Sequence, residues 1–200
     1  MIHNPMNNYK KLYKVVVKEL SEKLPSDLPY HGIAHTLDVI RATEFYARSA
    51  SIDDAHIILL QTAALLHETG IMKGYTDHET ASVRYALTAL PLYGYSTAQI
   101  DQISQLILDT RFPQQPTNLL SMILCDADLD YLGRPDYFAI SHKLRLEWIN
   151  LNNYTESLKQ WYQEQFLFLN EHQYFTPWAN KHRNSGKEHN IRLIENLLKY

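Results

Sequence analysis

The sequence predicts an all-α protein built as a single domain. Apolar residues recur at helical spacing along most of the chain, whereas the alternating pattern of a half-buried strand is scarce. A length of 200 residues is typical of one domain, and no internal repeat, low-complexity tract or long Gly/Ser linker divides the chain. We therefore expect one helical domain over 1–200, with a motif-bearing core at about 28–135 and a C-terminal helical extension at about 136–200.

Proline and capping residues divide the first half of the chain into helices. The apolar residues Leu12, Val16 and Leu20 indicate a helix that ends before Pro25. Ser96 or Thr97 can cap a later helix, because a hydroxyl oxygen accepts a hydrogen bond from a free backbone amide. The expected helices span 7–24, 35–50, 53–67, 77–90 and 96–109.

The second half of the chain continues the helical pattern. Pro113 and Pro116 indicate a loop, which an apolar run follows. Beyond Gly133, apolar and charged residues mix at the spacing of amphipathic helices, which we expect to pack over the central bundle. The expected helices span 119–129, 137–150, 154–171 and 177–198.

Composition and charge exclude several classes of function. A formal net charge of -3 gives no general attraction to nucleic acid, and the one local basic cluster lies at 181–187, so nucleic-acid binding is not favoured. The N-terminus lacks the apolar stretch of a signal peptide or membrane span. A single cysteine, Cys125, forms no internal disulfide and suits a reducing compartment. We expect a cytoplasmic protein without a membrane partner, and the sequence leaves open whether it forms a homo-oligomer.

Two segments place histidines in positions that suit metal binding. In YHGIAHTLDVI, at 30–40, His31 and His35 are four residues apart, which puts them on one face of a helix. In AALLHETG, at 63–70, His67 and Glu68 stand together at the end of an apolar helix. Burial of a carboxylate there is costly unless a divalent cation compensates it. The alternative is that the helix ends in solvent and both groups are hydrated.

A third segment, ILCDADLDYLG at 123–133, interrupts an apolar run with three acids, Asp126, Asp128 and Asp130. Residues two apart on a helix point in different directions, so one carboxylate can face inward alone. We expect that one to be Asp126, because it directly follows the apolar run 122–125. Two imidazoles and two carboxylates suit Mn, Fe, Ni, Zn or Mg, which leaves the identity of the metal open. A water in such a site can be activated near neutral pH.

The order of these motifs resembles that of the HD-domain superfamily of metal-dependent phosphohydrolases. The segment YHGIAHTLDV is similar to the YHNxxHxxDV segment of cyclic-nucleotide phosphodiesterases and their bacterial relatives. AALLHETG resembles ALLHDIG, with Glu68 in the place of Asp, and CDADLDYLGR resembles the final AD-containing motif. The match covers about 30–134 and implies a helical bundle of the HD/phosphodiesterase type.

The resemblance also implies roles for individual residues. It makes His35, His67, Glu68 and Asp126 the metal ligands, with Glu68 and Asp126 counted as catalytic through the metal. It makes His31 the proton donor to the leaving oxygen, a role that a histidine with a near-neutral pKa can perform. A structural His31, bonded to a loop carbonyl, is the alternative.

A second metal position is a further implication of the resemblance. His78, in DHETAS, matches one histidine of the dinuclear members. At the next such position the sequence LILDTR offers Asp109 instead of histidine. The second position would therefore use Glu68, His78 and Asp109.

The substrate class follows from the same resemblance. We expect hydrolysis of a small phosphomonoester or phosphodiester, of a nucleotide, by metal-activated water. The cations expected to bind phosphate are Arg134, Arg111 and Lys73, and the alternative is that each is a solvated surface charge. Two rival functions stay open: a non-catalytic metal- or ligand-binding module, which Glu68 in the place of Asp favours, and a di-iron oxygenase of the HD type.

Overall fold

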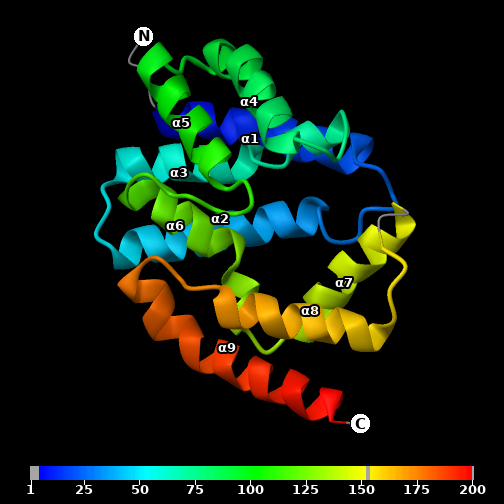
Figure 1. Ribbon diagram of the computed structural model, residues 1–200. Coiled ribbons are helices and arrows are strands. Elements are labelled where there is room, and N and C mark those ends of the chain that lie inside the picture. Colours follow the sequence, from blue (N-terminus) through cyan, green and yellow to red (C-terminus); the bar gives the residue numbers. More distant parts are fainter. Residues whose placement is uncertain (1–4, 152–153, 200) are drawn as a thin grey trace. The chain divides into compact units, whose positions relative to one another are not determined.

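Helices account for all the regular structure in the part of the chain that the computed structural model describes, residues 5–151 and 154–199 (Figure 1). The predicted all-α class is therefore confirmed. Within these residues no helix is both long enough and apolar enough to span a bilayer. The α-helices are α1 (Pro5–Lys23), α2 (Ile33–Ser49), α3 (Asp54–Leu66), α4 (His78–Ala89), α5 (Thr97–Asp109), α6 (Leu119–Asp128), α7 (Tyr137–Asn150), α8 (Leu158–Glu171) and α9 (Pro177–Leu198). Three short 3-10 helices join them: η1 (Thr69–Met72), η2 (Leu90–Tyr93) and η3 (Asp130–Gly133).

Backbone packing divides the chain into two compact units. The first comprises α1, the residues as far as Pro25, and His31–Asp128. The second comprises Ser26–Tyr30 and the chain from Leu129 onward. The division falls at 128/129, close to the boundary near 135 that the sequence predicts between core and extension. The single domain over 1–200 stays a prediction.

Helix α3 forms the core of the first unit. Its sequence DAHIILLQTAALL is apolar on every side after the first turn, and nine of its 13 residues are buried. A helix that is apolar all round must be covered on every face. Helices α1, α2, α5 and α6 supply that cover, and α2 also packs against α6. The residues that directly follow α3 therefore lie in the interior of the first unit.

A glycine allows the next helix to approach this end of α3. An added Cβ on Gly70 would overlap the carbonyl oxygen of His78 and would lie 2.7 Å from the backbone nitrogen of Ser82. The Ser82 hydroxyl accepts a hydrogen bond from the Gly70 amide and donates one to the carbonyl oxygen of His67, both at 2.7 Å. Close packing thus explains why a glycine stands at the end of the HETG segment: without a side chain at this position, α4 can pack on η1 directly beside His67.

In the second unit, α9 packs against η3 and α8. The Asp130 carboxylate of η3 accepts hydrogen bonds from the Arg183 guanidinium at 2.7 and 3.2 Å. Gly133 and Gly186 let the two backbones meet without a Cβ between them. These contacts hold α9 on η3.

The structure confirms the expected start of α5 but places the start of α8 later than the sequence predicts. Ser96, rather than Thr97, caps α5, and its hydroxyl accepts the backbone amide of Gln99. The helix expected from Tyr154 begins later, at Leu158. The cause is Ser157, whose hydroxyl accepts the Gln160 amide, so the helix starts at this cap rather than at the preceding aromatic residue.

Candidate metal centre

His67 and Glu68 stand where α3 ends. His67 is the C-cap of α3 and is 1% exposed, and Glu68 is 3% exposed. The Nδ1 atom of His67 lies 2.8 Å from the carbonyl oxygen of Ala64. Because a carbonyl oxygen only accepts hydrogen bonds, Nδ1 carries a proton and donates it. In the neutral ring, Nε2 therefore presents a lone pair to the interior.

Two further side chains meet His67, namely His35 from α2 and Asp128 from the end of α6. The Nε2 atom of His35 lies 3.3 Å from Nε2 of His67 and 3.2 Å from Oδ1 of Asp128. That Oδ1 atom also lies 3.6 Å from Nε2 of His67. One ligand atom from each residue lies within 4.8 Å of the other two. We refer to these three residues as the His35–His67–Asp128 cluster.

The cluster has the size and the donor atoms of a divalent-cation site. Bonds of about 2.1 Å to nitrogen or oxygen would place neighbouring ligands about 3.0 to 3.4 Å apart in octahedral or tetrahedral geometry. The observed separations of 3.3 and 3.2 Å from His35 fall in this range. Lone pairs that face one another repel unless positive charge lies between them. The residues therefore fit a divalent metal ion.

Glu68 faces the cluster with one oxygen and turns away from it with the other. Its Oε1 atom lies 3.3 Å from Nε2 of His67 and 3.9 Å from Nε2 of His35. Its Oε2 atom lies 3.6 Å from Nε2 of His78, and this buried oxygen has no hydrogen-bond partner. The longer side chain, glutamate in the place of aspartate, thus reaches the cluster.

The structure brings Asp128, and not Asp126, to the two imidazoles. Asp126 is buried, at 1% exposure, but it is not among the residues whose ligand atoms come together. Residues two apart are rotated by about 200° around a helix axis, so only one of the two carboxylates can point toward α2 and α3. The expected choice of Asp126 rested on burial, yet α6 is buried from Ile123 to Ala127 and burial does not distinguish its faces. A usable signal was the AD pair itself, because Asp128 is the acid that follows Ala127.

His78 is presented to Glu68 by the start of α4. Its Nδ1 atom lies 3.1 Å from the carbonyl oxygen of Tyr75, to which it donates, and its Nε2 atom faces Glu68. The Nε2 atom also lies 3.6 Å from Oε1 of Glu79, a buried acid that the sequence reasoning missed. Glu79 directly follows His78 in DHETAS, which is the signal that was available.

Asp109 does not join His78 in the described contacts. Its carboxylate accepts hydrogen bonds from Gln105 at 2.7 Å and from the hydroxyl of Thr117 at 2.9 Å. These bonds hold the loop between α5 and α6. The acid that lies beside His78 in the described contacts is Glu79, and the expected second position with Asp109 stays a prediction.

His31 lies within the same group of rings. Its ring centroid is 6.0 Å from that of His35, 5.7 Å from that of His78 and 5.4 Å from that of Tyr75. His31 is partly exposed, whereas His67 is buried. Of the four neighbouring histidines, His31, His35, His67 and His78, His31 is therefore more accessible to solvent than His67.

The three expected phosphate-binding cations have different surroundings. Arg111 contacts Asp77, Thr80 and Glu79 at the start of α4. Lys73 is exposed, and its charge contributes to the lowered pKa of Glu19 on α1. Arg134 belongs to the second unit, where it pairs with Asp136 at 2.7 Å and with Asp130 at 3.4 Å.

The electrostatics of the cluster favour positive charge. Burial opposes ionisation of Glu68, but His31, His67 and His78 outweigh it and hold the pKa of Glu68 well below its usual range. Burial likewise opposes protonation of His67, yet Glu68 and Asp128 raise the pKa of His67. The pKa of His78 rises to about 9 against the same burial, because Glu68 and Glu79 face it. The acidic side chains thus draw a cation or protons to this place.

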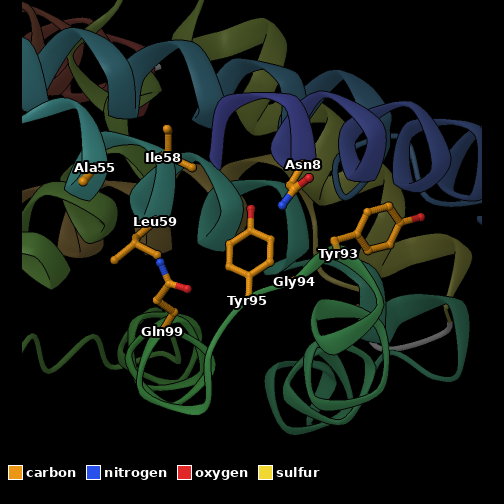
Figure 2. Close-up of a pocket in the computed structure, with 8 residues that line it drawn as sticks. All are labelled: Asn8, Ala55, Ile58, Leu59, Tyr93, Gly94, Tyr95 and Gln99. Carbon is orange, nitrogen blue, oxygen red and sulfur yellow. The ribbon is translucent and has the colours of Figure 1, made fainter. Parts of the chain in front are cut away.

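A pocket of about 230 Å³ lies at the other end of α3 (Figure 2). Ile58 and Leu59 form part of its wall, Tyr95 lines it from the segment before α5, and Gln99 lines it from the first turn of α5. Leu59 and His67 are eight residues apart, or about 12 Å along a helix. This pocket is therefore not part of the cluster.

Comparisons with known proteins identify the fold. No protein-family model and no curated protein matches the chain. A structure described as a predicted HD superfamily hydrolase, from an uncultured Thermotogales bacterium, aligns with a TM-score of 0.61 at 23% identity and covers 93% of this chain and 91% of that one. YpgQ of Bacillus subtilis, in complex with ADP, aligns with a TM-score of 0.69 at 16% identity and covers 98% and 95%. The resemblance to the HD superfamily is confirmed at the level of the fold, and the chain has the helical fold of HD-superfamily proteins.

Proposed function

We propose that the protein is a metal-dependent phosphohydrolase that cleaves a phosphate ester of a nucleotide. The observation that carries the proposal is the convergence of His35, His67 and Asp128 from three helices, with their acceptor atoms 3.2 to 3.6 Å apart. The fold, shared with a predicted HD superfamily hydrolase, supports the same reaction class.

The cluster and Glu68 would hold the divalent cation. Two imidazole nitrogens and two carboxylate oxygens suit Mn, Fe, Ni, Zn or Mg. When bound, such a cation polarises a phosphoryl oxygen and lowers the pKa of a coordinated water. Asp128, together with His35 and His67, would hold the cation, and Oε1 of Glu68, which lies 3.3 Å from Nε2 of His67, would add a further ligand.

His31 would donate a proton to the leaving oxygen. It lies next to His35 and is partly exposed, so it can reach a substrate atom at the edge of the cluster.

The substrate class rests on one neighbour of the same fold. YpgQ was determined with ADP, so a protein with this fold accommodates a nucleoside diphosphate. We propose a nucleotide as the substrate here as well. The phosphate-binding roles expected of Arg134, Arg111 and Lys73 stay predictions.

Turnover of a panel of nucleotides tests the proposal. Nucleoside mono-, di- and triphosphates and cyclic nucleotides are incubated with the protein and with added Mn, Co, Ni, Zn or Mg, and released phosphate or product is measured. We expect at least one nucleotide to be cleaved with one of these metals, and the rate of His67→Ala to fall by about 1000-fold or more, since loss of a catalytic group commonly costs this much.

Two controls make this experiment decisive. His56→Ala, an exposed histidine at the other end of α3, should cleave like the wild type. If the wild type binds metal with micromolar affinity or better but cleaves no phosphate ester, the hydrolase proposal is wrong and the non-catalytic module stands in its place.

A proton-donor role of His31 predicts a loss of rate that depends on the leaving group of the substrate. We expect His31→Asn to bind metal as the wild type does, but to cleave a nucleotide about 100-fold more slowly, within the range for loss of a general acid. A nitrophenyl phosphate ester, whose leaving group needs no proton, should lose much less. Equal losses for the two substrates would contradict a proton-donor role.

A further inference from the structure

Helix α7 carries a glutamate, Glu147, whose side chain is fully buried, at 0% exposure. Burial of a carboxylate is costly unless hydrogen bonds compensate it. Its Oε2 atom accepts a hydrogen bond of 3.0 Å from the backbone amide of Tyr30, 117 positions earlier in the chain. Both residues belong to the second unit, which includes the short segment Ser26–Tyr30. A buried acid of this unit therefore holds the backbone of the residue that directly precedes His31.

Two further contacts hold the same short segment within the second unit. Asn150, three residues after Glu147 on α7, donates a hydrogen bond of 2.9 Å to the carbonyl oxygen of Asp27. Residues three apart share one face of a helix, so one face of α7 binds this backbone at two places. The ring of Tyr30 also packs edge-on against that of Tyr131 in η3, with the centroids 5.7 Å apart. The segment is thus held at three points.

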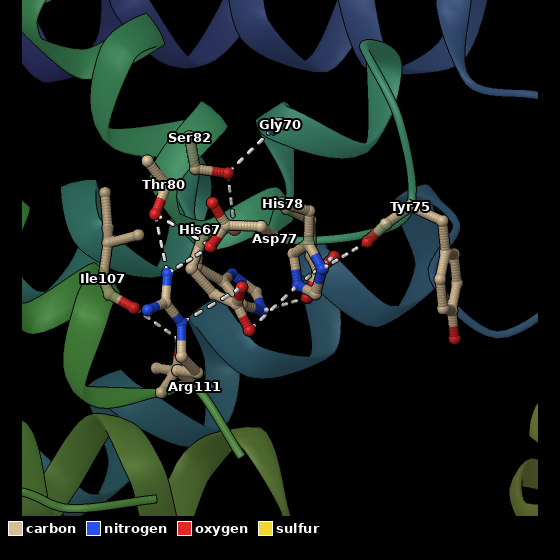
Figure 3. Close-up of polar contacts among 12 residues, drawn as sticks. His67, Gly70, Tyr75, Asp77, His78, Thr80, Ser82, Ile107 and Arg111 are labelled. Atoms are coloured by element: carbon tan, nitrogen blue, oxygen red, sulfur yellow. Dashed lines mark hydrogen bonds and ion pairs between the residues drawn. The ribbon is translucent and has the colours of Figure 1, made fainter. Parts of the chain in front are cut away.

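His31 lies just outside the helix that follows it. Gly32 is the N-cap of α2, and the backbone hydrogen bonds of the helix begin at the Gly32 carbonyl oxygen. The ring of His31 lies beside those of Tyr75 and His78, which are joined by a hydrogen bond from His78 to the Tyr75 carbonyl (Figure 3). Because a planar peptide bond joins His31 to Tyr30, the position of this ring depends on how the Tyr30 backbone is held.

We infer that Glu147 is a positioning residue for proton transfer: it accepts the Tyr30 amide and so holds His31 where the ring can protonate the leaving oxygen. The inference rests on the proposed function for the role of His31. Without Glu147, the buried amide would lose an acceptor, and the segment would shift to recover a hydrogen bond. That shift would move His31, while the ligand atoms of the His35–His67–Asp128 cluster stay on α2, α3 and α6.

Rates on two substrates test the inference. The full chain, with the metal that supports cleavage, is given a nucleotide that the wild type cleaves and a nitrophenyl phosphate ester. In Glu147→Leu, an apolar side chain of similar volume replaces the acceptor. Its kcat for the nucleotide should fall about tenfold, a part of the loss expected for the general acid itself. The KM for the nucleotide, the affinity for metal and the rate on the nitrophenyl ester should change little, because they do not depend on the proton.

Three variants separate positioning from a general loss of structure. Glu147→Gln keeps an oxygen that can accept the Tyr30 amide, so it should recover most of the rate. In a His31→Asn background, Glu147→Leu should slow the reaction by no more than about twofold further, because both residues act through one group. Glu171→Leu makes the same substitution at an exposed position at the end of α8, and it should cleave the nucleotide as the wild type does.

A spectroscopic readout needs no turnover. In the full chain with diamagnetic Zn²⁺ added, the ring resonances of His31 are assigned by their absence from His31→Asn. They should move in Glu147→Leu but not in Glu171→Leu. Asn150→Ala, at an exposed position, removes only the hydrogen bond to Asp27 and should move the same resonances by a smaller amount. This variant makes the comparison even if Glu147→Leu does not fold.

The contrary outcomes are distinguishable. If Glu147→Leu slows both substrates equally, or adds its full loss to that of His31→Asn, Glu147 does not act through His31, and the inference is overturned while the proposed function stands. Equal losses in Glu147→Gln and Glu147→Leu, or His31 resonances that do not move, would overturn it as well. A wild type that cleaves no phosphate ester would overturn the proposed function and the inference with it.

Discussion

Asp128→Asn should lose divalent-metal affinity by about 100-fold or more, because the substitution replaces a carboxylate ligand by a neutral amide. Asp126→Asn should bind metal within about threefold of the wild type. The reason is geometric: Oδ1 of Asp128 lies 3.2 Å from His35 and 3.6 Å from His67, whereas Asp126 is not in the cluster. The measurement is calorimetric titration of the chelator-stripped proteins with Mn²⁺ or Zn²⁺.

The comparison of two acids on one helix supplies its own control. Both variants replace an aspartate by asparagine on the same helix, so a general loss of stability in α6 would affect both. Circular dichroism confirms that each variant is folded before titration. If Asp126→Asn loses affinity and Asp128→Asn retains it, the ligand set derived from the geometry is wrong and the original expectation from the sequence is right.

Gly70→Ala should lower the free energy of unfolding by about 3 kcal/mol, at the upper end of the usual cost of overpacking a tight contact. The added methyl group meets backbone atoms of His78 and Ser82 rather than a flexible side chain, so α4 must move as a whole. Urea denaturation followed by circular dichroism measures the change. Thr88→Ala, at an exposed position of the same helix, should change stability by less than about 0.5 kcal/mol.

The same variant should also affect metal binding. Movement of α4 displaces His78 and breaks the hydrogen bonds by which Ser82 joins Gly70 to His67. We therefore expect weaker metal binding in Gly70→Ala than in Thr88→Ala at temperatures where both are folded. A stability within about 0.5 kcal/mol of the wild type would show that the contact at Gly70 relaxes freely, contrary to the expected clash.

The helices could be predicted because their signals are local. The expected spans 137–150 and 177–198 match α7 and α9, since apolar spacing and Pro177 define them within the sequence. The position of His67 and Glu68 was also readable, because an apolar run that ends in two polar groups places those groups at a buried helix end. These inferences need no knowledge of which helix packs on which.

The partners of the site could not be read in the same way. The choice between Asp126 and Asp128 depends on the rotation of α6 about its axis, which tertiary packing decides because the helix is buried continuously from Ile123 to Ala127. The hydrogen bond from the Thr117 hydroxyl to the Asp109 carboxylate depends on how the loop between α5 and α6 folds. The pairing of Arg111 with Asp77 joins residues 34 positions apart, and no local pattern announces it.

A cation held at the His35–His67–Asp128 cluster, as we propose, would also stabilise the folded chain. A ligand that binds only the native state adds about 2.7 kcal/mol of stability when its concentration is 100 times its dissociation constant. For a protein of ordinary marginal stability, that increment is a large share of the total, and it sets the fraction of chains open to proteolysis. Cellular supply of the preferred cation would then influence the abundance of this chain, and a chelator would remove the stability that the bound cation adds.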